Sequence, residues 1–168
     1  MIERARNGLG VVVALWALSA TVGAQAQMSP AEVEAVKKDV VAHLDKYYRA
    51  FTELRPDVLA GEVFNIPWVV IGANGPQADM TREEAHARFQ ASMTQLTESG
   101  WARSVFTTES VCVLNGTAAI ASGYNTRYKK DGSVMSVGGV TYVLGKSKDG
   151  WRIVSYSGHP KGKGVRCE

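Results

Sequence analysis

The stretch VLNGTAAIASGYNTRYKKDGSVMSVGGVTYVLGKSKDGWRIVSYSGHP, from Val113 to Pro160, decides the fold class of this chain. From Arg103 onward, apolar and polar residues alternate with the period of two that is typical of a β-strand. Three turn dipeptides interrupt the alternation, namely Asn115-Gly116, Asp131-Gly132 and Asp149-Gly150. The pattern predicts four strands that run as an antiparallel meander.

A long helix is predicted upstream of this sheet. Ser29-Pro30-Ala31-Glu32 combines a capping serine, a proline that suits the first helical position and the glutamate of a capping box. Apolar residues then recur at spacings of three and four, which defines one buried face. The face comprises Val33, Val36, Val40, Leu44, Tyr47, Phe51 and Leu54, and Arg55-Pro56 ends the helix.

A short helix, a hairpin and a further helix complete the predicted elements. PDVLAGEVF, which begins at Pro56, suits a short helix, and IPWVVIGANGPQADM suits a hairpin with its turn at Asn74-Gly75. Thr81-Arg82-Glu83-Glu84 is a second capping box. It opens a helix whose apolar face is Ala85, Phe89, Met93 and Leu96.

Helices followed by a long meander predict an α+β domain. We expect a cone, in which the N-terminal helices pack in the concave face of a strongly bent antiparallel sheet and leave an open mouth. Gly123, Gly138 and Gly139 lie within strands, where glycine often marks a bulge or a sharp bend.

Residues 1–26 have the three parts of a secretory signal peptide. A charged start with positive excess precedes a short apolar run, and Ala24-Gln25-Ala26 presents small residues for cleavage. A membrane anchor is the alternative, but the run is shorter than the roughly 20 residues that span a bilayer. We expect one mature domain, residues 27–168, that is periplasmic or secreted and has no membrane contact after cleavage. The net charge of +3 comes from scattered residues, which does not favour nucleic acid as a partner.

The two cysteines, Cys112 and Cys167, are predicted to form a disulfide. Export leads to an oxidising compartment, and an even number of cysteines permits pairing. Cys112 lies in a strand pattern and also suits a buried free thiol. Cys167 near the terminus would otherwise be an exposed thiol, which favours the bridge.

The order helix, helix, hairpin, capped helix and four strands, ending in DGWRIV, resembles the nuclear transport factor 2-like superfamily and its SnoaL-like group. The resemblance covers essentially residues 27–168. It implies a pocket between the helices and the concave sheet face, and in the enzymes of the superfamily a histidine or aspartate acts there as acid or base. The superfamily includes isomerases, dehydratases, hydrolases and many members without known activity, so the fold alone does not assign a reaction.

The last strand departs from the pattern of the group. Many SnoaL-like sequences continue WRIV with two histidines, whereas this chain has Ser155 and Ser157 at those positions. A serine can donate a hydrogen bond to a ligand but does not titrate near neutral pH. His159 shares their parity, but Gly158 and Pro160 beside it predict a surface loop.

His86 and Asp79 remain the best candidates for a catalytic base. His86 lies beside the apolar face of the second capped helix, and an unperturbed imidazole has the pKa needed for proton transfer. A half-exposed structural histidine is the alternative, and carboxylates near a helix start are also explained by the helix dipole. His43 lies off its apolar stripe and is predicted to face solvent. No histidine, aspartate or glutamate cluster has the spacing of metal ligands, and no cofactor is expected.

Aromatic residues on several elements suggest a ligand pocket. Tyrosine combines an apolar ring with a hydrogen-bonding hydroxyl, which suits a small amphipathic ligand. We expect Tyr47, Trp68, Tyr124 and Tyr142, with Ser155 and Ser157, to bind it; Tyr48 and Tyr128 are further candidates. The alternative is that these rings fill the cone as core or form a homodimer face. Three functions follow: an exported protein that binds a small organic molecule without catalysis; a small isomerase, dehydratase or hydrolase; or a homodimeric interaction module.

Overall fold

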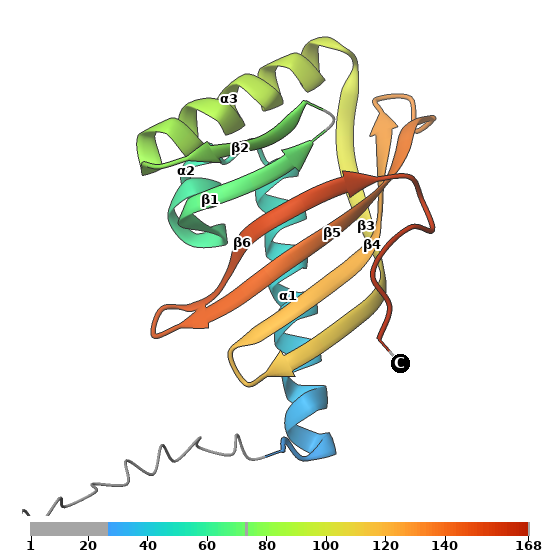
Figure 1. Cartoon of the computed structure of the whole chain (residues 1–168). Coiled ribbons are helices and arrows are strands. Elements are labelled where there is room, and N and C mark those ends of the chain that lie inside the picture. Colours follow the sequence, from blue (N-terminus) through green and yellow to red (C-terminus); the bar gives the residue numbers. More distant parts are fainter. Residues whose placement is uncertain (1–26, 73, 168) are drawn as a thin grey trace, which may run out of the picture.

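The computed structural model describes residues 27–72 and 74–167, which form a helical layer and one curled sheet (Figure 1). Both capping boxes, the hairpin and all four strands of the meander are present as predicted. The helices are α1 (Pro30–Thr52), α2 (Pro56–Val58), the π-helical turn η1 (Leu59–Val63) and α3 (Arg82–Glu98). The strands are β1 (Phe64–Gly72), β2 (Gly75–Asp79), β3 (Trp101–Asn115), β4 (Ala118–Lys129), β5 (Val134–Ser147) and β6 (Gly150–His159).

The sheet is mixed, whereas the sequence predicted an antiparallel one. Its strand order is β2-β1-β6-β5-β4-β3. The meander β3 to β6 is antiparallel throughout, but β1 pairs with β6 in parallel. The meander leaves one edge of β6 open, and the β1–β2 hairpin occupies that edge. This pairing joins residues far apart in the chain, such as Val70 and Tyr156, so no local pattern predicts it.

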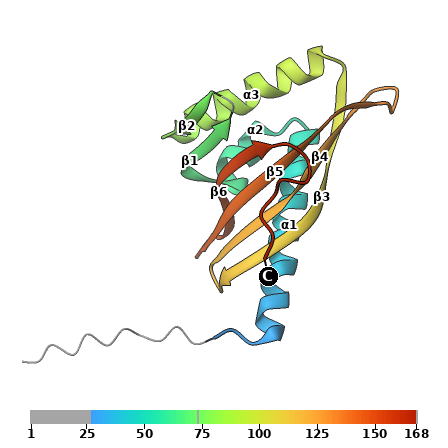
Figure 2. The ribbon, with the colours of Figure 1, turned by 45° about the vertical axis from the view of Figure 1, so that its right-hand side comes forward.

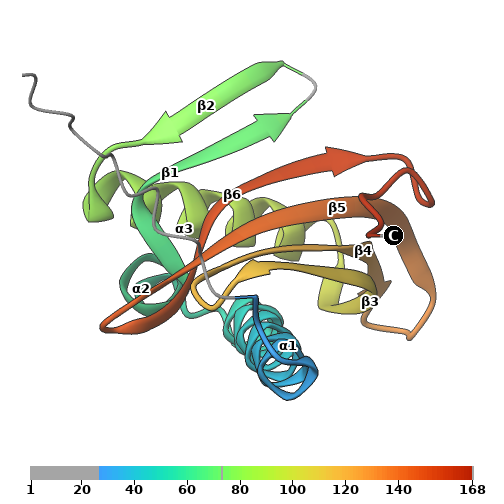
Figure 3. The ribbon, with the colours of Figure 1, turned by 60° about the horizontal axis from the view of Figure 1, so that its bottom comes forward.

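All the helices lie on one side of the sheet, which curls around them (Figures 2 and 3). α1 passes under the strands β3 to β6, and α3 lies near β1 and β2 (Figure 3). The core fills the space between these layers, and its largest fully buried side chains include Trp68, Tyr142 and Phe64. The core therefore lies between the helices and the concave face of the sheet, as the sequence predicted.

The face of α1 is rotated slightly from the predicted stripe. Tyr48 is buried, whereas Tyr47 is half-buried. The helix ends at Thr52, and Leu54 lies beyond it with a φ of 56° and 46% of its surface exposed. Leu54 is therefore not part of the core, which corrects its assignment to the apolar face.

Two of the three glycines inside the strands serve close approach, and Gly123 also lies beside a bulge. A Cβ atom at Gly123 would collide with the carbonyl oxygen of Thr107, and one at Gly139 would collide with the His159 ring. One pairing register shifts next to Gly123, between Thr108 and Ser110, and a second shifts away from the glycines, between Val143 and Leu144. The second shift lies opposite Ile153 and Ser155, so Val154 is an extra residue in β6.

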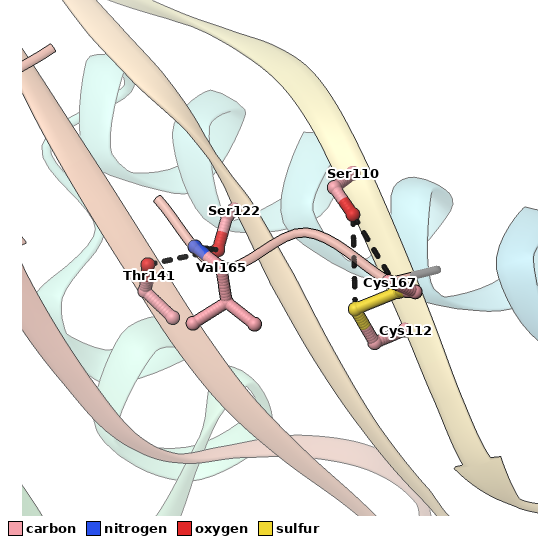
Figure 4. Close-up of a disulfide and its surroundings, with 6 residues drawn as sticks. All are labelled: Ser110, Cys112, Ser122, Thr141, Val165 and Cys167. Carbon is pink, nitrogen blue, oxygen red and sulfur yellow. Dashed lines mark hydrogen bonds between the residues drawn. A yellow bond between two sulfur atoms is a disulfide. The ribbon is translucent and has the colours of Figure 1, made fainter. Parts of the chain in front are cut away.

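The predicted disulfide is present and fastens the C-terminal tail to the outer, convex face of the sheet. Cys112 on β3 is bonded to Cys167, with their Cα atoms 5.5 Å apart. Between the last strand and this bond, the Val165 N–H donates to the Ser122 hydroxyl at 3.0 Å (Figure 4). The tail thus crosses β4 on the face opposite the helices (Figure 1).

The expected signal peptide, residues 1–26, lies outside the described residues. Within the described part of the chain, none of the helices combines the length and apolar character that a membrane span requires.

Candidate functional site

A cavity of about 80 Å³ lies between α1, α3 and the concave face of the sheet. It is smaller than the roughly 150 Å³ cavity that holds benzene in an engineered protein core. The helices and strands α1, β1, α3, β3, β4 and β6 all contribute to its wall. The lining residues are Tyr47, Tyr48, Phe51, Trp68, Arg88, Phe89, Ser92, Ser104, Asn125, Arg127 and Tyr156.

Aromatic rings form most of the apolar wall. Trp68 lies 5.5 Å from both the Phe89 and Tyr156 ring centroids and stacks on each. Tyr47 and Tyr48 make an edge-to-face pair on α1, with centroids 4.7 Å apart. Tyr47 also packs on Phe64 of β1 and Tyr48 on Phe106 of β3, so rings from several elements contact one another. The aromatic wall is therefore closely packed around the cavity.

Three buried polar atoms in the wall have no hydrogen-bond partner within the described residues. They are the indole nitrogen of Trp68, the side-chain oxygen of Asn125 and the Nε atom of Arg127. A buried donor or acceptor without a partner costs about 1–3 kcal/mol, and more when it is charged. All three belong to residues that line the same cavity. Three residues with an unpartnered buried polar atom thus surround one cavity, which suits a polar occupant.

Of the two arginines that line the cavity, Arg88 is paired with a carboxylate of the described residues and Arg127 is not. Arg88 Nε donates to both carboxylate oxygens of Asp79, at 2.9 and 2.7 Å, and its Nη1 donates to Gln77 at 2.9 Å. Asp79 is 4% exposed and faces α3 in this pair. None of the five ion pairs found in residues 27–72 and 74–167 involves Arg127. The cavity therefore holds one positive charge without a counter-charge.

The tyrosines of the cavity act as neutral hydroxyl groups. Burial raises the pKa of Tyr47, Tyr48 and Tyr156, and the nearby charge of Arg127 only partly opposes this effect. The Tyr48 hydroxyl is also hydrogen-bonded to that of Tyr142 at 2.6 Å. Near neutral pH these groups hold their protons, so they can orient a ligand but do not act as bases.

A family model described as "NTF2-like protein (DUF6841)" matches residues 31–161, which is most of the chain. The protein belongs to this NTF2-like family. The resemblance read from the sequence is thus confirmed at the level of the NTF2-like superfamily. No curated protein matches the chain.

Solved structures support the same NTF2-like fold. An NTF2-like protein of unknown function from Shewanella oneidensis shares 18% identity, with a TM-score of 0.61, and the match covers 74% of this chain and 98% of that one. An NTF2-like protein with a cystatin-like fold from Novosphingobium aromaticivorans shares 12%, with a TM-score of 0.61 and coverages of 79% and 88%. A domain of unknown function from Nostoc punctiforme shares 18%, with a TM-score of 0.60 and coverages of 80% and 80%. Such identities establish the fold and leave the ligand of this NTF2-like chain to be argued from its own residues.

Three of the six predicted ligand-binding residues lie at or beside the NTF2-like cavity. Tyr47 and Trp68 line it directly. Tyr142 lies behind it, where its ring is 2% exposed and packs 6.0 Å from Tyr47. Tyr142 thus supports the wall through its contacts and its hydrogen bond to Tyr48.

Tyr124, Ser155 and Ser157 lie on the outer face of the sheet, away from the cavity. Tyr124 has Lys161 of the tail over its ring, 3.9 Å from the centroid. The bulge at Val154 reverses the parity of β6, so Ile153 and Tyr156 point inward while the two serines point outward. The Ser157 hydroxyl donates to the carbonyl of Ile71 at 3.3 Å. The correspondence between these serines and the histidines of related chains therefore does not place them in the pocket.

The candidate catalytic residues lie outside the cavity wall. His86 is exposed and lines a separate surface hollow with Asp57, Arg82 and Glu83. Asp79 is buried but is occupied by Arg88. The structure therefore separates both residues from the aromatic rings that the sequence grouped with them.

The other two histidines differ from their predicted positions. His43 is half-buried, and its Nε2 atom lies 3.0 Å from the carbonyl oxygen of Val63. His159 is not in a loop, because β6 extends to it and pairs it with Gly139. Its ring is hydrogen-bonded to the Thr141 hydroxyl at 2.9 Å on the outer face.

Arg127, Asn125, Arg88 and Tyr156 were not identified from the sequence. For Asn125 and Arg127, the alternation of inward and outward residues along β4 contained a signal. Ala119, Ala121 and Gly123 point inward, and the same parity continues to Asn125 and Arg127. Polar residues at inward positions of a strand are unusual unless they have a partner or a function. No group of histidine, cysteine, aspartate or glutamate residues in the described chain is arranged to hold a metal ion.

Proposed function

We propose that this protein is an exported, single-domain NTF2-like protein that binds a small organic molecule in its aromatic cavity. The observation that carries the proposal is that three residues with unpartnered buried polar atoms line one cavity walled by aromatic rings. Such a combination of apolar walls and a few polar groups is the usual character of a ligand site. Export is supported by the signal-like residues 1–26 and by the disulfide.

Binding is favoured over catalysis by the chemistry of the wall. The lining residues supply hydroxyl, indole, amide and guanidinium groups, whose ordinary pKa values lie far from neutrality. Acid–base catalysis works best with a group whose pKa is near the working pH. An isomerase, dehydratase or hydrolase that uses His86 or Asp79 would require these side chains to reach a substrate outside the cavity described above.

The test is a screen of small compounds in which binding is detected by the NMR signal of the Trp68 indole. The indole N–H resonance of Trp68, assigned with the Trp68→Phe variant, should shift when small polar organic compounds are added, and the melting temperature should rise with it. Ser92→Leu, which fills the cavity, should abolish both responses. Thr94→Leu on the exposed side of the same helix is the matched control and should retain them. A screen in which no compound moves the Trp68 resonance would contradict the proposal.

A homodimer through the outer sheet face is a second candidate. Four valines are exposed on that face: Val105, Val137, Val143 and Val154, with 37% to 46% of their surfaces accessible. They lie in two pairs, Val105 with Val137 and Val143 with Val154, and exposed apolar residues on a sheet face favour association. Light scattering after gel filtration should give twice the monomer mass, and Val143→Lys with Val137→Lys should restore the monomer.

A further inference from the structure

The positive charge of Arg127 determines what kind of molecule the cavity suits. Its Nε atom is buried without a partner, although a guanidinium group is always charged at physiological pH. Arg88, on the opposite wall, is already neutralised by Asp79. An uncompensated charge in a partly desolvated space is costly, and an anion removes that cost. The occupant should therefore carry negative charge.

Two of the three free hydrogen-bonding atoms are donors, which agrees with an anion. The Nε of arginine and the Nε1 of tryptophan can only donate hydrogen bonds, so both require acceptors. An ionised carboxylate has two acceptor oxygens and matches the planar guanidinium geometry. The free atom of Asn125 is its side-chain oxygen, which accepts hydrogen bonds, so it suits a hydroxyl or N–H group elsewhere on the same ligand.

The size and the walls of the cavity restrict the rest of the ligand. About 80 Å³ accommodates only a few carbon atoms inside the enclosed part. The rings of Trp68, Phe89 and Tyr156 give these carbons an apolar contact surface. A single uncompensated arginine balances a single negative charge, which favours a monoanion over phosphate or sulfate.

We propose that the cavity binds a small organic monocarboxylate, with the carboxylate on Arg127 and Trp68 and the carbon chain against the aromatic rings. This inference rests on the proposed function and adds the class of ligand. Arg127 is then the residue that determines specificity, because it separates a carboxylate from a neutral molecule of equal size.

The experiment compares carboxylates with their neutral amides. Acetate, propionate and butyrate are each titrated beside the corresponding amide, with the Trp68 indole resonance as the readout. At least one carboxylate should bind about tenfold or more tightly than its amide, the amount expected for a charge-assisted hydrogen bond. Sodium chloride and inorganic phosphate, added at the same ionic strength, should not displace it.

Arg127→Gln should weaken binding of that carboxylate about tenfold or more and leave binding of the amide unchanged. Arg103→Gln is the matched control, because Arg103 lies on the adjacent strand but stacks on Tyr128 on the outer face, 4.0 Å from the ring centroid. Without ligand, Arg127→Gln should melt no lower than the wild type, since it removes an unpaired charge. Arg127→Lys keeps the positive charge but loses the planar guanidinium group. Its affinity for the carboxylate should lie between those of the wild type and Arg127→Gln.

The outcomes separate the two proposals. Equal affinities for carboxylates and amides, or displacement of the carboxylate by chloride or phosphate, would overturn the monocarboxylate inference and leave the ligand-binding function intact. If the Trp68 resonance responds to neither series nor to any compound of the wider screen, both proposals fail.

Discussion

At the scale of single residues, the environment of a side chain depends on contacts that its own neighbourhood in the chain does not reveal. His43 lies beside the apolar stripe of α1, yet η1 folds over it and places the Val63 carbonyl 3.0 Å from its Nε2 atom. Burial is the main cause that lowers the pKa of His43 below its ordinary value of 6.5; the hydrogen bond to Val63 opposes this shift, and the charges of Arg152 and Lys46 add to it. The imidazole is therefore neutral at neutral pH and donates its N–H to Val63.

This lowered pKa predicts a loss of stability on acidification. Between the folded and unfolded pKa values the unfolded chain binds more protons, so the free energy of unfolding falls as the pH drops below about 6.5. Urea unfolding of the wild type at about pH 7.5 and pH 5.5 should show this loss, and His43→Gln should show a smaller one. His86→Gln, at an exposed position, should behave as the wild type does. An identical pH dependence in His43→Gln and the wild type would exclude this role.

At the scale of elements, the capping boxes show that helix starts follow from local chemistry. The Thr81 hydroxyl accepts from the Glu84 N–H at 3.2 Å, and the Glu84 carboxylate accepts from the N–H groups of Thr81 and Met80 at 3.2 and 2.7 Å. These bonds satisfy backbone donors that the first turn of α3 leaves free. The start of α3 is adjacent to Asp79, so the cap also positions the Asp79–Arg88 pair beside the cavity.

Thr81→Ala should therefore lower the free energy of unfolding by about 1 kcal/mol, the usual cost of a lost N-cap. Thr94→Ala in the exposed middle of the same helix is the control and should be neutral or slightly stabilising, because alanine has the higher helix propensity. Denaturant unfolding monitored by circular dichroism measures the free energy of unfolding of both variants. Equal effects of the two substitutions would show that the cap contributes nothing beyond helix propensity.

At the scale of the whole molecule, the disulfide and the cavity lie on opposite faces of one sheet. The bond joins residues 55 positions apart and holds the tail against Ser122, whose hydroxyl also contacts Thr141 at 2.8 Å (Figure 4). The core and the cavity lie on the concave side and do not include Cys112 or Cys167. The bond should therefore affect stability more than ligand binding.

Reduction, or the paired change Cys112→Ser with Cys167→Ser, should lower the free energy of unfolding by up to about 4 kcal/mol, the chain-entropy value for a loop of this length. The near-ultraviolet spectrum of the buried aromatic cluster should be retained at 20 °C or so, because no cavity residue contacts the bond. Ser110→Ala, which removes a hydroxyl 3.6 Å from the Cys167 sulfur, is the control and should change stability by much less. Equal stability of the oxidised and reduced protein would contradict this prediction.

The sequence by itself determined the elements and the fold class, because their signals are local. Capping boxes, turn dipeptides and the alternation of β3 to β6 each depend on residues a few positions apart, and a chain with this order of elements closes into the NTF2-like cone. The tertiary structure alone decided which side chains meet. One extra residue at Val154 moved Ser155 and Ser157 outward and Tyr156 inward, since a shift of one position reverses every side chain of a strand. The parallel pairing of β1 with β6 and the unpaired charge of Arg127 likewise depend on contacts across the fold, where the balance of burial and hydrogen bonding is set by partners distant in the chain.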